Sequence, residues 1–266
     1  MNGSLLVMLA VALVFGPGIR WLQLMSRVRL PCDARAYVAA NALGAACGLA
    51  APFAGAGTLT SIGGVIAALG GLLFLGLLAA SGQRSTPPAV RVGGPLLDFV
   101  AADDAGHPFD LASLRGHAVL LKFFRGHWCP YCVAELRRWE EMRPALETLG
   151  VRIVTVCADS AAAIRAGRAK HGLHATMLPD PDLAITDRYH LRNPRNFAPK
   201  PGLVIPLPIP TTVLADAAGT VRWIDQATDY MRRSDPQRVL GTIRAALAPA
   251  TKAPRDTRTP VDVTPA

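Results

Sequence analysis

Two cysteines separated by two residues, Cys129 and Cys132, are the side chains in this sequence whose type and spacing best fit redox chemistry. On a helix, residues three apart lie on one face, so the two thiols can approach and close a small disulfide ring. Pro130 between them favours a first helical turn, which makes Cys129 the N-cap, where unpaired N–H groups stabilise a thiolate. We therefore predict that Cys129 is the attacking nucleophile. Cys132, one turn further in, is predicted to be the resolving thiol with the higher pKa.

The remaining cysteines give no second site. Cys32, Cys47 and Cys157 stand alone, and five cysteines at irregular spacing do not form a disulfide-stapled framework. A C-x-x-C pair is also half of a zinc ligand set, but no second pair follows, and His117 and His127 lack ligand spacing. We therefore expect no metal and no cofactor, and we interpret Cys157 as a small buried hydrophobic residue.

The order of secondary structure around the pair predicts an α/β, thioredoxin-like fold with a central mixed sheet flanked by helices. Residues 119–124 and 152–157 are apolar runs typical of buried strands, and a helix starting at Cys129 should kink or end at Pro144. We expect further strands at 96–100, 109–111, 175–178, 211–215 and 220–224, and further helices after Asp159-Ser160, Asp180-Pro181 and Asp235-Pro236. A βαβ unit followed by a ββα unit, with C-x-x-C at the first strand-to-helix junction, is the thioredoxin order.

A proline-rich stretch precedes the last two strands. Residues 192–208 contain five prolines, so we expect an irregular loop there. Ile209-Pro210-Thr211 then stands where thioredoxin-like folds hold a cis-proline against the redox pair. Because a cis X–Pro bond is uncommon, we predict that Pro210 supports the site and leaves a backbone edge free to pair with a substrate.

Residues 123–132 (FFRGHWCPYC), followed by Glu135-Leu136-Arg137, resemble the peroxiredoxin-like branch of the alkyl hydroperoxide reductase/thiol-specific antioxidant (redoxin) family. The downstream residues Leu207-Pro208-Ile209-Pro210-Thr211-Thr212, Asp216, Gly219, Asp229-Tyr230, Arg232-Arg233 and Asp235-Pro236 are similar to the same branch. The likeness covers about residues 93–248. It implies a thioredoxin fold and thiol-dependent antioxidant chemistry, with Trp128, Pro130, Pro210 and Arg125 supporting the two cysteines.

Three functions remain open. In a dithiol–disulfide oxidoreductase, Cys129 attacks a disulfide of a protein or small molecule, Cys132 releases it, and a thiol reductant restores the pair. In a thiol peroxidase, Cys129 reduces a hydroperoxide and Arg125 stabilises the leaving oxygen. However, Lys122 and Gly126 occupy the positions that are Pro and Thr or Ser in peroxiredoxins proper, which favours the oxidoreductase. The third alternative is a non-catalytic redox sensor or scaffold in the membrane.

The first 85 residues differ from the rest and predict a membrane anchor. Their charged side chains are Arg20, Arg27, Arg29, Asp33, Arg35 and Arg84. Apolar stretches at 5–19, 37–56 and 59–80 predict a bundle of two or three transmembrane helices, since about 20 apolar residues span a bilayer. We expect a linker at 86–92, the redox domain at 93–248 and a disordered tail at 249–266.

The arginine distribution predicts the orientation of this anchor in a bacterial inner membrane. If 37–56 and 59–80 form a hairpin, the loop before it lies on the same side as the redox domain. That side holds Arg20, Arg27, Arg29, Arg35, Arg84 and Arg91, and the opposite side holds no basic residue. The positive-inside rule then places the domain in the cytoplasm, with the periplasm as the alternative. The net charge of +9 does not indicate nucleic-acid binding, because the basic residues are scattered or lie beside apolar stretches.

Overall fold

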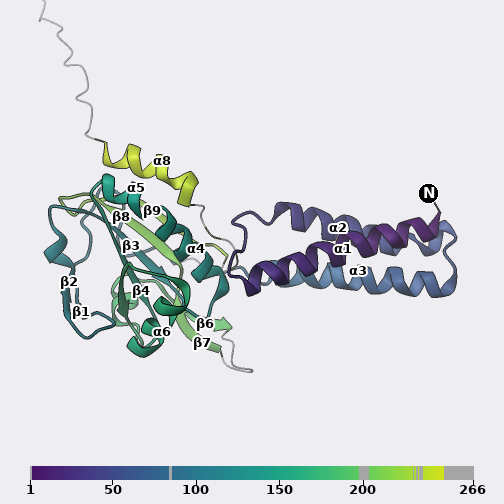
Figure 1. Cartoon of the computed structure of the whole chain (residues 1–266), viewed down its shortest axis with the longest axis horizontal. Coiled ribbons are helices and arrows are strands. Elements are labelled where there is room, and N and C mark those ends of the chain that lie inside the picture. The colour runs from purple at the N-terminus through teal and green to yellow at the C-terminus, as the bar shows by residue number, and fades with distance from the viewer. Residues whose placement is uncertain are drawn as a thin grey trace, which may run out of the picture.

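The computed structural model of the 266-residue chain describes residues 2–83, 86–197, 204–229, 231, 233 and 236–248. A long bundle of N-terminal helices joins an α/β domain at one of its ends (Figure 1). The predicted disordered tail, together with Arg84, Tyr230, Arg232 and Asp235, lies outside the described residues.

The α/β domain is built on a five-stranded sheet of order β5-β4-β3-β8-β9. These strands are β3 (Ala118–Phe124), β4 (Val151–Cys157), β5 (Thr176–Pro179), β8 (Thr211–Ala215) and β9 (Val221–Gln226). β3, β4 and β5 are parallel, whereas β8 runs antiparallel to β3 and β9 runs antiparallel to β8. Every residue of the central strand β3 is buried, as its apolar run predicts. The predicted mixed sheet of the thioredoxin-like fold is confirmed.

Helices cover the sheet, and the helix after Asp159-Ser160 begins at its predicted cap, whereas the helix predicted after Asp180-Pro181 begins later, at Ala184. The helices are α4 (Pro130–Glu141), α5 (Arg143–Thr148), α6 (Ala161–His171), α7 (Ala184–Arg188) and α8 (Pro236–Leu247). The break between α4 and α5 confirms the interruption expected at Pro144. Ser160 caps α6 by accepting a hydrogen bond from the Ala163 N–H at 3.3 Å.

The hydrophobic core divides between the two faces of the sheet. Leu120 of β3 shares one cluster with Trp139 of α4 and Ile243 of α8. Leu121 and Phe123 point to the other face, where Tyr189 belongs to the same cluster. The N-terminal part of the domain closes this second face with β1 (Val100–Ala102), β2 (Pro108–Asp110) and the 3₁₀ helix η2 (Leu111–Leu114).

The proline-rich stretch is a hairpin, so the prediction of an irregular loop at 192–208 is wrong. β6 (Arg192–Phe197) pairs antiparallel with β7 (Val204–Pro208) in a separate two-stranded sheet, with a register shift between Asn193 and Asn196. Prolines are tolerated here because each strand of a two-stranded ribbon has a free edge, and a missing N–H on that edge breaks no ladder bond.

The N-terminal bundle consists of α1 (Gly3–Ser26), α2 (Arg35–Ala50), the 3₁₀ turn η1 (Pro52–Ala54) and α3 (Thr58–Ala79). α1 continues through Pro17 and is longer than the predicted 5–19 stretch. Small residues bring α2 and α3 close together. A Cβ added to Gly48 would lie 2.3 Å from the Gly64 carbonyl oxygen.

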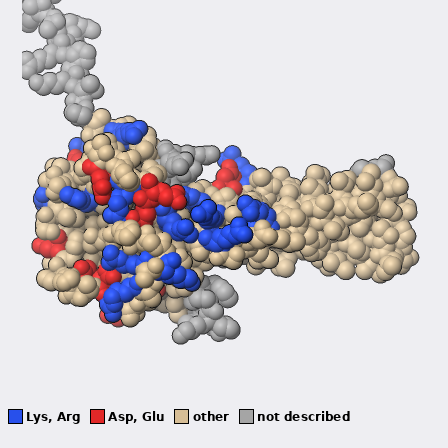
Figure 2. Space-filling view, in the orientation of Figure 1, with Lys and Arg blue, Asp and Glu red and all other residues tan. Residues whose placement is uncertain are grey.

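Among the described residues, α1 and α3 are the helices long and apolar enough to cross a membrane. The expected 20-residue span at 37–56 is wrong in length, since α2 has 16 residues and Pro52 begins a 3₁₀ turn that ends the regular helix. The bundle shows mostly uncharged side chains on the face seen in Figure 2, with Lys and Arg gathered where it meets the domain. Arg20, Arg27, Arg29 and Arg35, all exposed, belong to this end.

The bundle packs directly against the helix that carries the redox motif. The Trp21 ring lies 4.9 Å from the Tyr37 ring and 6.4 Å from the ring of Tyr131 in α4. The Arg138 guanidinium donates to the Leu30 carbonyl oxygen and, at 2.9 Å, to Cys32 Sγ. Apolar residues at this end of the bundle therefore share one buried cluster with Cys129 and Cys132.

Candidate active site

The redox pair lies at the junction of β3 and α4, where the sequence predicts it. Cys129 is the N-cap of α4 in an extended conformation, and Pro130 occupies the first helical turn. Cys132 follows one turn later, and its thiol is hydrogen-bonded to that of Cys129. Cys129 is 1% exposed and Cys132 is fully buried, so both sulfurs are enclosed in this conformation.

Arg233, from the segment before α8, brings its charge to the second cysteine. Its Nη2 donates to Cys132 Sγ at 3.4 Å, and the Arg125 backbone N–H also donates to this sulfur. Burial raises the pKa of Cys132, but the hydrogen bond from Cys129, the Arg233 charge and these donors together lower it well below its usual value. The hydrogen bond to Cys132 and burial raise the pKa of Cys129.

The expectation that Cys132 has the higher pKa is therefore wrong. The N-cap position of Cys129 was the only local signal, and Arg233 lies about a hundred residues away in sequence. The two thiols titrate as a pair. The first proton leaves easily, because the remaining negative charge is held on Cys132 beside Arg233, and the second proton stays on Cys129.

A buried charge network continues behind Cys132. Lys122 Nζ lies 2.7 Å from Glu135 Oε1 and donates to Thr212 Oγ1 at 3.0 Å. The Arg233 Nε lies 3.3 Å from Glu135 Oε2. The side chains of Lys122, Glu135 and Arg233 are at most 4% exposed, so Glu135 is the counter-ion of two buried cations.

A cavity of about 220 Å³ opens beside this network. Its walls include Lys122, Glu135, Arg233, Pro210 and residues 225–229. The prediction that Pro210 is cis is wrong, because the described residues include no cis peptide bond. The backbone on both sides of the Ile209–Pro210 bond is hydrogen-bonded within the domain: the Ala227 N–H donates to the Pro210 carbonyl oxygen at 2.8 Å, and the Ile209 N–H donates to the Leu191 carbonyl oxygen at 2.7 Å.

Trp128 and Arg125 flank the pair on the side of the β3–α4 connection. Trp128 is 37% exposed, next to a cysteine that is enclosed. The Arg125 guanidinium lies 5.0 Å from the Trp128 ring centre, and its side chain is buried. Trp128, Arg125 and Pro130 adjoin the pair along the chain, with Trp128 as the exposed part, whereas Pro210 lines the cavity beside Arg233.

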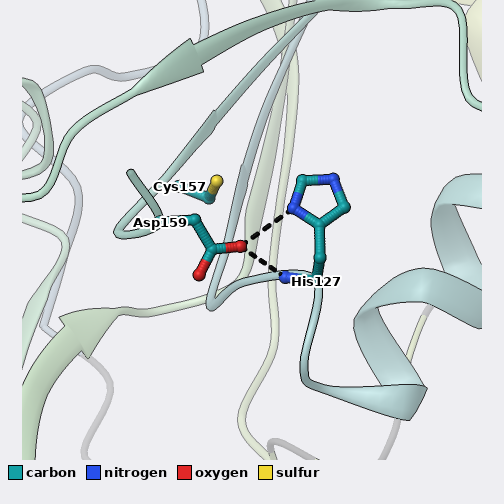
Figure 3. A group of neighbouring side chains, drawn as sticks. All are labelled: His127, Cys157 and Asp159. Atoms are coloured by element: carbon teal, nitrogen blue, oxygen red, sulfur yellow. Dashed lines mark hydrogen bonds and ion pairs between the residues drawn. The ribbon is translucent and has the colours of Figure 1, made fainter. Parts of the chain in front are cut away.

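Asp159 fixes the connection that leads into Cys129. Its Oδ2 accepts the His127 backbone N–H at 2.6 Å and lies 2.9 Å from His127 Nδ1 (Figure 3). Cys157 lies beside them, fully buried as predicted, and burial and the Asp159 charge raise its pKa. These residues offer ligand-type atoms within 4.8 Å of one another, a grouping hidden from the sequence by their separation. Because Asp159 Oδ2 already binds the His127 backbone N–H and the ring Nδ1, we interpret the group as a structural lock.

Two parts of the site were not predicted from the sequence. Arg233 occurs in the downstream stretch that carries the family resemblance, but its contact with Cys132 depends on the tertiary fold. The Lys122–Glu135 pair had a usable signal. Lys122 is a charged residue inside a buried apolar strand, and such a residue requires a buried partner of opposite charge.

Comparison with known proteins supports redox chemistry. The chain is 29% identical over 179 residues to the thiol-disulfide oxidoreductase ResA of Geobacillus kaustophilus, covering 65% of this chain and 92% of that protein. It is 35% identical over 113 residues to the soluble secreted antigen MPT53 of Mycobacterium tuberculosis, covering 41% of this chain and 62% of MPT53.

The fold is also found in a solved structure. The crystal structure of the peroxidoxin BcpB of Mycobacterium tuberculosis matches with a TM-score of 0.50 and 18% identity, over 59% of this chain and 97% of BcpB. This likeness concerns the thioredoxin-like fold alone. The relatives and the enclosed dithiol make the protein an oxidoreductase that acts through thiols. Residues 92–224 match the AhpC/TSA family, and the chain belongs to this family within the thioredoxin-like superfamily.

Proposed function

We propose that the protein is a membrane-anchored thiol–disulfide oxidoreductase in which Cys129 attacks and Cys132 resolves. The observation that carries this proposal is the asymmetry around the two sulfurs. Cys129 caps α4 beside the exposed Trp128, whereas Cys132 is held in the interior by Arg233 and the Arg125 N–H. We infer that a substrate approaches Cys129 from the side of the exposed Trp128, and that Cys132 becomes the stabilised thiolate.

The reaction begins with a proton shift within the pair. The Cys132 thiolate accepts the Cys129 proton, and the Cys129 thiolate attacks one sulfur of the substrate disulfide, releasing the other sulfur as a thiolate. Cys132 then loses its proton, which the nearby Arg233 favours, and attacks Cys129 Sγ. The second substrate thiol leaves, and the protein holds a Cys129–Cys132 disulfide. A dithiol reductant returns two electrons and two protons to the pair.

Peroxide reduction is disfavoured by the backbone at Gly126. Its φ of +154° and its surroundings exclude a side chain, because an added Cβ would lie 2.6 Å from both Asp159 Oδ1 and Trp128 Nε1. A threonine cannot occupy this position without displacing the Asp159 lock. The hydroxyl that aligns a peroxide in peroxiredoxins proper is thus absent and has no room at this position.

The full chain in detergent, supplied with dithiothreitol, is expected to reduce a protein disulfide at least about tenfold faster than it consumes hydrogen peroxide. Insulin reduction, followed by turbidity, and peroxide loss are measured on the same preparation. The Cys129→Ser/Cys132→Ser double variant provides the background of both assays. Faster loss of peroxide than of disulfide would make the protein a thiol peroxidase instead.

The anchor is proposed to cross the membrane with α1 and α3, with α2 and the η1 turn returning across it between them because α1 and α3 run in the same direction, and to hold the redox domain in the cytoplasm. The exposed arginines at the domain end of the bundle support this orientation, whereas the secreted relative MPT53 favours the periplasm. A phosphatase reporter fused after Leu247 should be inactive, and a fluorescent reporter that requires the cytoplasm should be active. The reverse pattern would place the redox pair in the periplasm.

A further inference from the structure

The end of the third bundle helix contacts the segment that precedes Arg233. Ser81 follows α3 directly and is fully buried. Its hydroxyl lies 2.6 Å from the Leu78 carbonyl oxygen and within hydrogen-bond distance of Asp229 Oδ1. The same Asp229 oxygen accepts the Met231 backbone N–H at 2.7 Å. Asp229 therefore binds the bundle end with its side chain and shapes the turn that leads to Arg233.

The backbone of Asp229 holds the arginine itself. The Asp229 carbonyl oxygen accepts a hydrogen bond from Arg233 Nη1 at 3.2 Å. The other terminal nitrogen of this guanidinium, Nη2, donates to Cys132 Sγ at 3.4 Å. A continuous path of contacts thus runs from Ser81 through Asp229 and Arg233 to the sulfur.

Backbone pairing strengthens the first step of this path. Gly82 forms an antiparallel bridge with Asp229, and the Gln83 N–H donates to the Thr228 carbonyl oxygen at 2.8 Å. Residues 225–229 also line the cavity beside Arg233. The residues that follow α3 therefore act as a short added strand that fixes this wall of the cavity.

We propose that Asp229 is a positioning residue of the redox reaction, which, through Ser81, lets the end of α3 hold Arg233 against Cys132. The proposal rests on the thiol–disulfide function proposed above. A guanidinium held at one distance stabilises the Cys132 thiolate, and a guanidinium free to move stabilises it less. The other titratable groups that face Cys132 or Arg233, or line the adjoining cavity, are Cys129, Arg125, Cys157, Glu135, Lys122 and Asp225.

Ser81→Ala removes the side-chain tie and leaves the Asp229 turn in place. The pH midpoint for alkylation of the redox pair should rise by about one unit, because the cation beside the thiolate is held less firmly. Iodoacetamide labelling of Cys129 and Cys132 is measured against pH on the full chain in detergent. Ser61→Ala is the matched control, since Ser61 donates to Ala56 O at the opposite end of α3.

A double-variant cycle separates this role from a general loss of structure. In an Arg233→Gln background, Ser81→Ala should produce no further shift of the alkylation midpoint, because the cation that Ser81 helps to position is gone. An unchanged midpoint in Ser81→Ala, or an equal shift in both backgrounds, overturns the positioning role. If the wild-type chain forms no Cys129–Cys132 disulfide on oxidation, the proposed redox function fails, and the positioning role fails with it.

Discussion

Cys132→Ser is expected to lower the rate of disulfide turnover at least about a thousandfold, while leaving Cys129 able to attack a substrate disulfide. Without the second thiol, the mixed disulfide between Cys129 and the substrate has no resolving group inside the protein. Incubation with a disulfide-containing peptide should therefore yield a stable one-to-one adduct on Cys129. Mass spectrometry before and after treatment with dithiothreitol detects the adduct and its release.

Two further variants test the assignment of roles. Cys129→Ser should lose turnover equally and form no stable adduct, because the attacking sulfur is gone. Cys47 lies in α2, away from the pair. The Cys47→Ser variant should therefore retain turnover. An adduct on Cys132 in Cys129→Ser, together with none in Cys132→Ser, would reverse the assigned roles.

Glu135→Ala is expected to lower the free energy of unfolding by about 3–5 kcal/mol. The carboxylate is the buried counter-ion of Lys122 and Arg233, at 2.7 and 3.3 Å, and its removal takes a negative charge away from two buried cations. Thermal or denaturant unfolding of the full chain in detergent measures the change. Glu147→Ala, on the exposed face of α5, should change the same free energy by less than about 0.5 kcal/mol.

The cause of this loss can be checked with a compensated variant. Lys122→Met combined with Glu135→Leu removes one charge of each sign and fills the same volume with apolar atoms. This variant should recover much of the stability lost in Glu135→Ala, as apolar replacements of buried ion pairs commonly do. If Glu135→Ala lowers the free energy of unfolding by less than about 1 kcal/mol, water in the neighbouring cavity already solvates the charges of Lys122 and Arg233.

The parts of the fold that depend on local patterns were predictable. The run at 119–124 became β3, Pro144 separated α4 from α5, and Ser160 capped α6. Each depends on neighbouring residues alone, through burial on both faces, a missing N–H or a capping hydroxyl. The strand-to-helix junction with Cys129 at its N-cap follows from the same local rules.

The predictions that were wrong concern features that depend on residues distant in sequence. The hairpin at 192–208 exists because two proline-containing strands pair with each other, and single-strand propensity argues against both. The bond between Ile209 and Pro210 is trans, and the contacts of these two residues with Leu191 and Ala227 cannot be read from the neighbouring sequence. Likewise, the charge on Cys132 depends on Arg233, and no local rule places a guanidinium beside that sulfur.

The enclosure of both sulfurs limits how far they can be oxidised. Conversion of a thiol to sulfinic or sulfonic acid requires repeated encounters of the same sulfur with an oxidant, and susceptibility follows exposure. With Cys129 only 1% exposed and hydrogen-bonded to Cys132, a sulfenic acid formed there would condense with its neighbour before a second oxidant molecule arrived. We therefore expect oxidation by peroxide to stop at a reversible Cys129–Cys132 disulfide, and the protein to survive bursts of peroxide that inactivate exposed thiols.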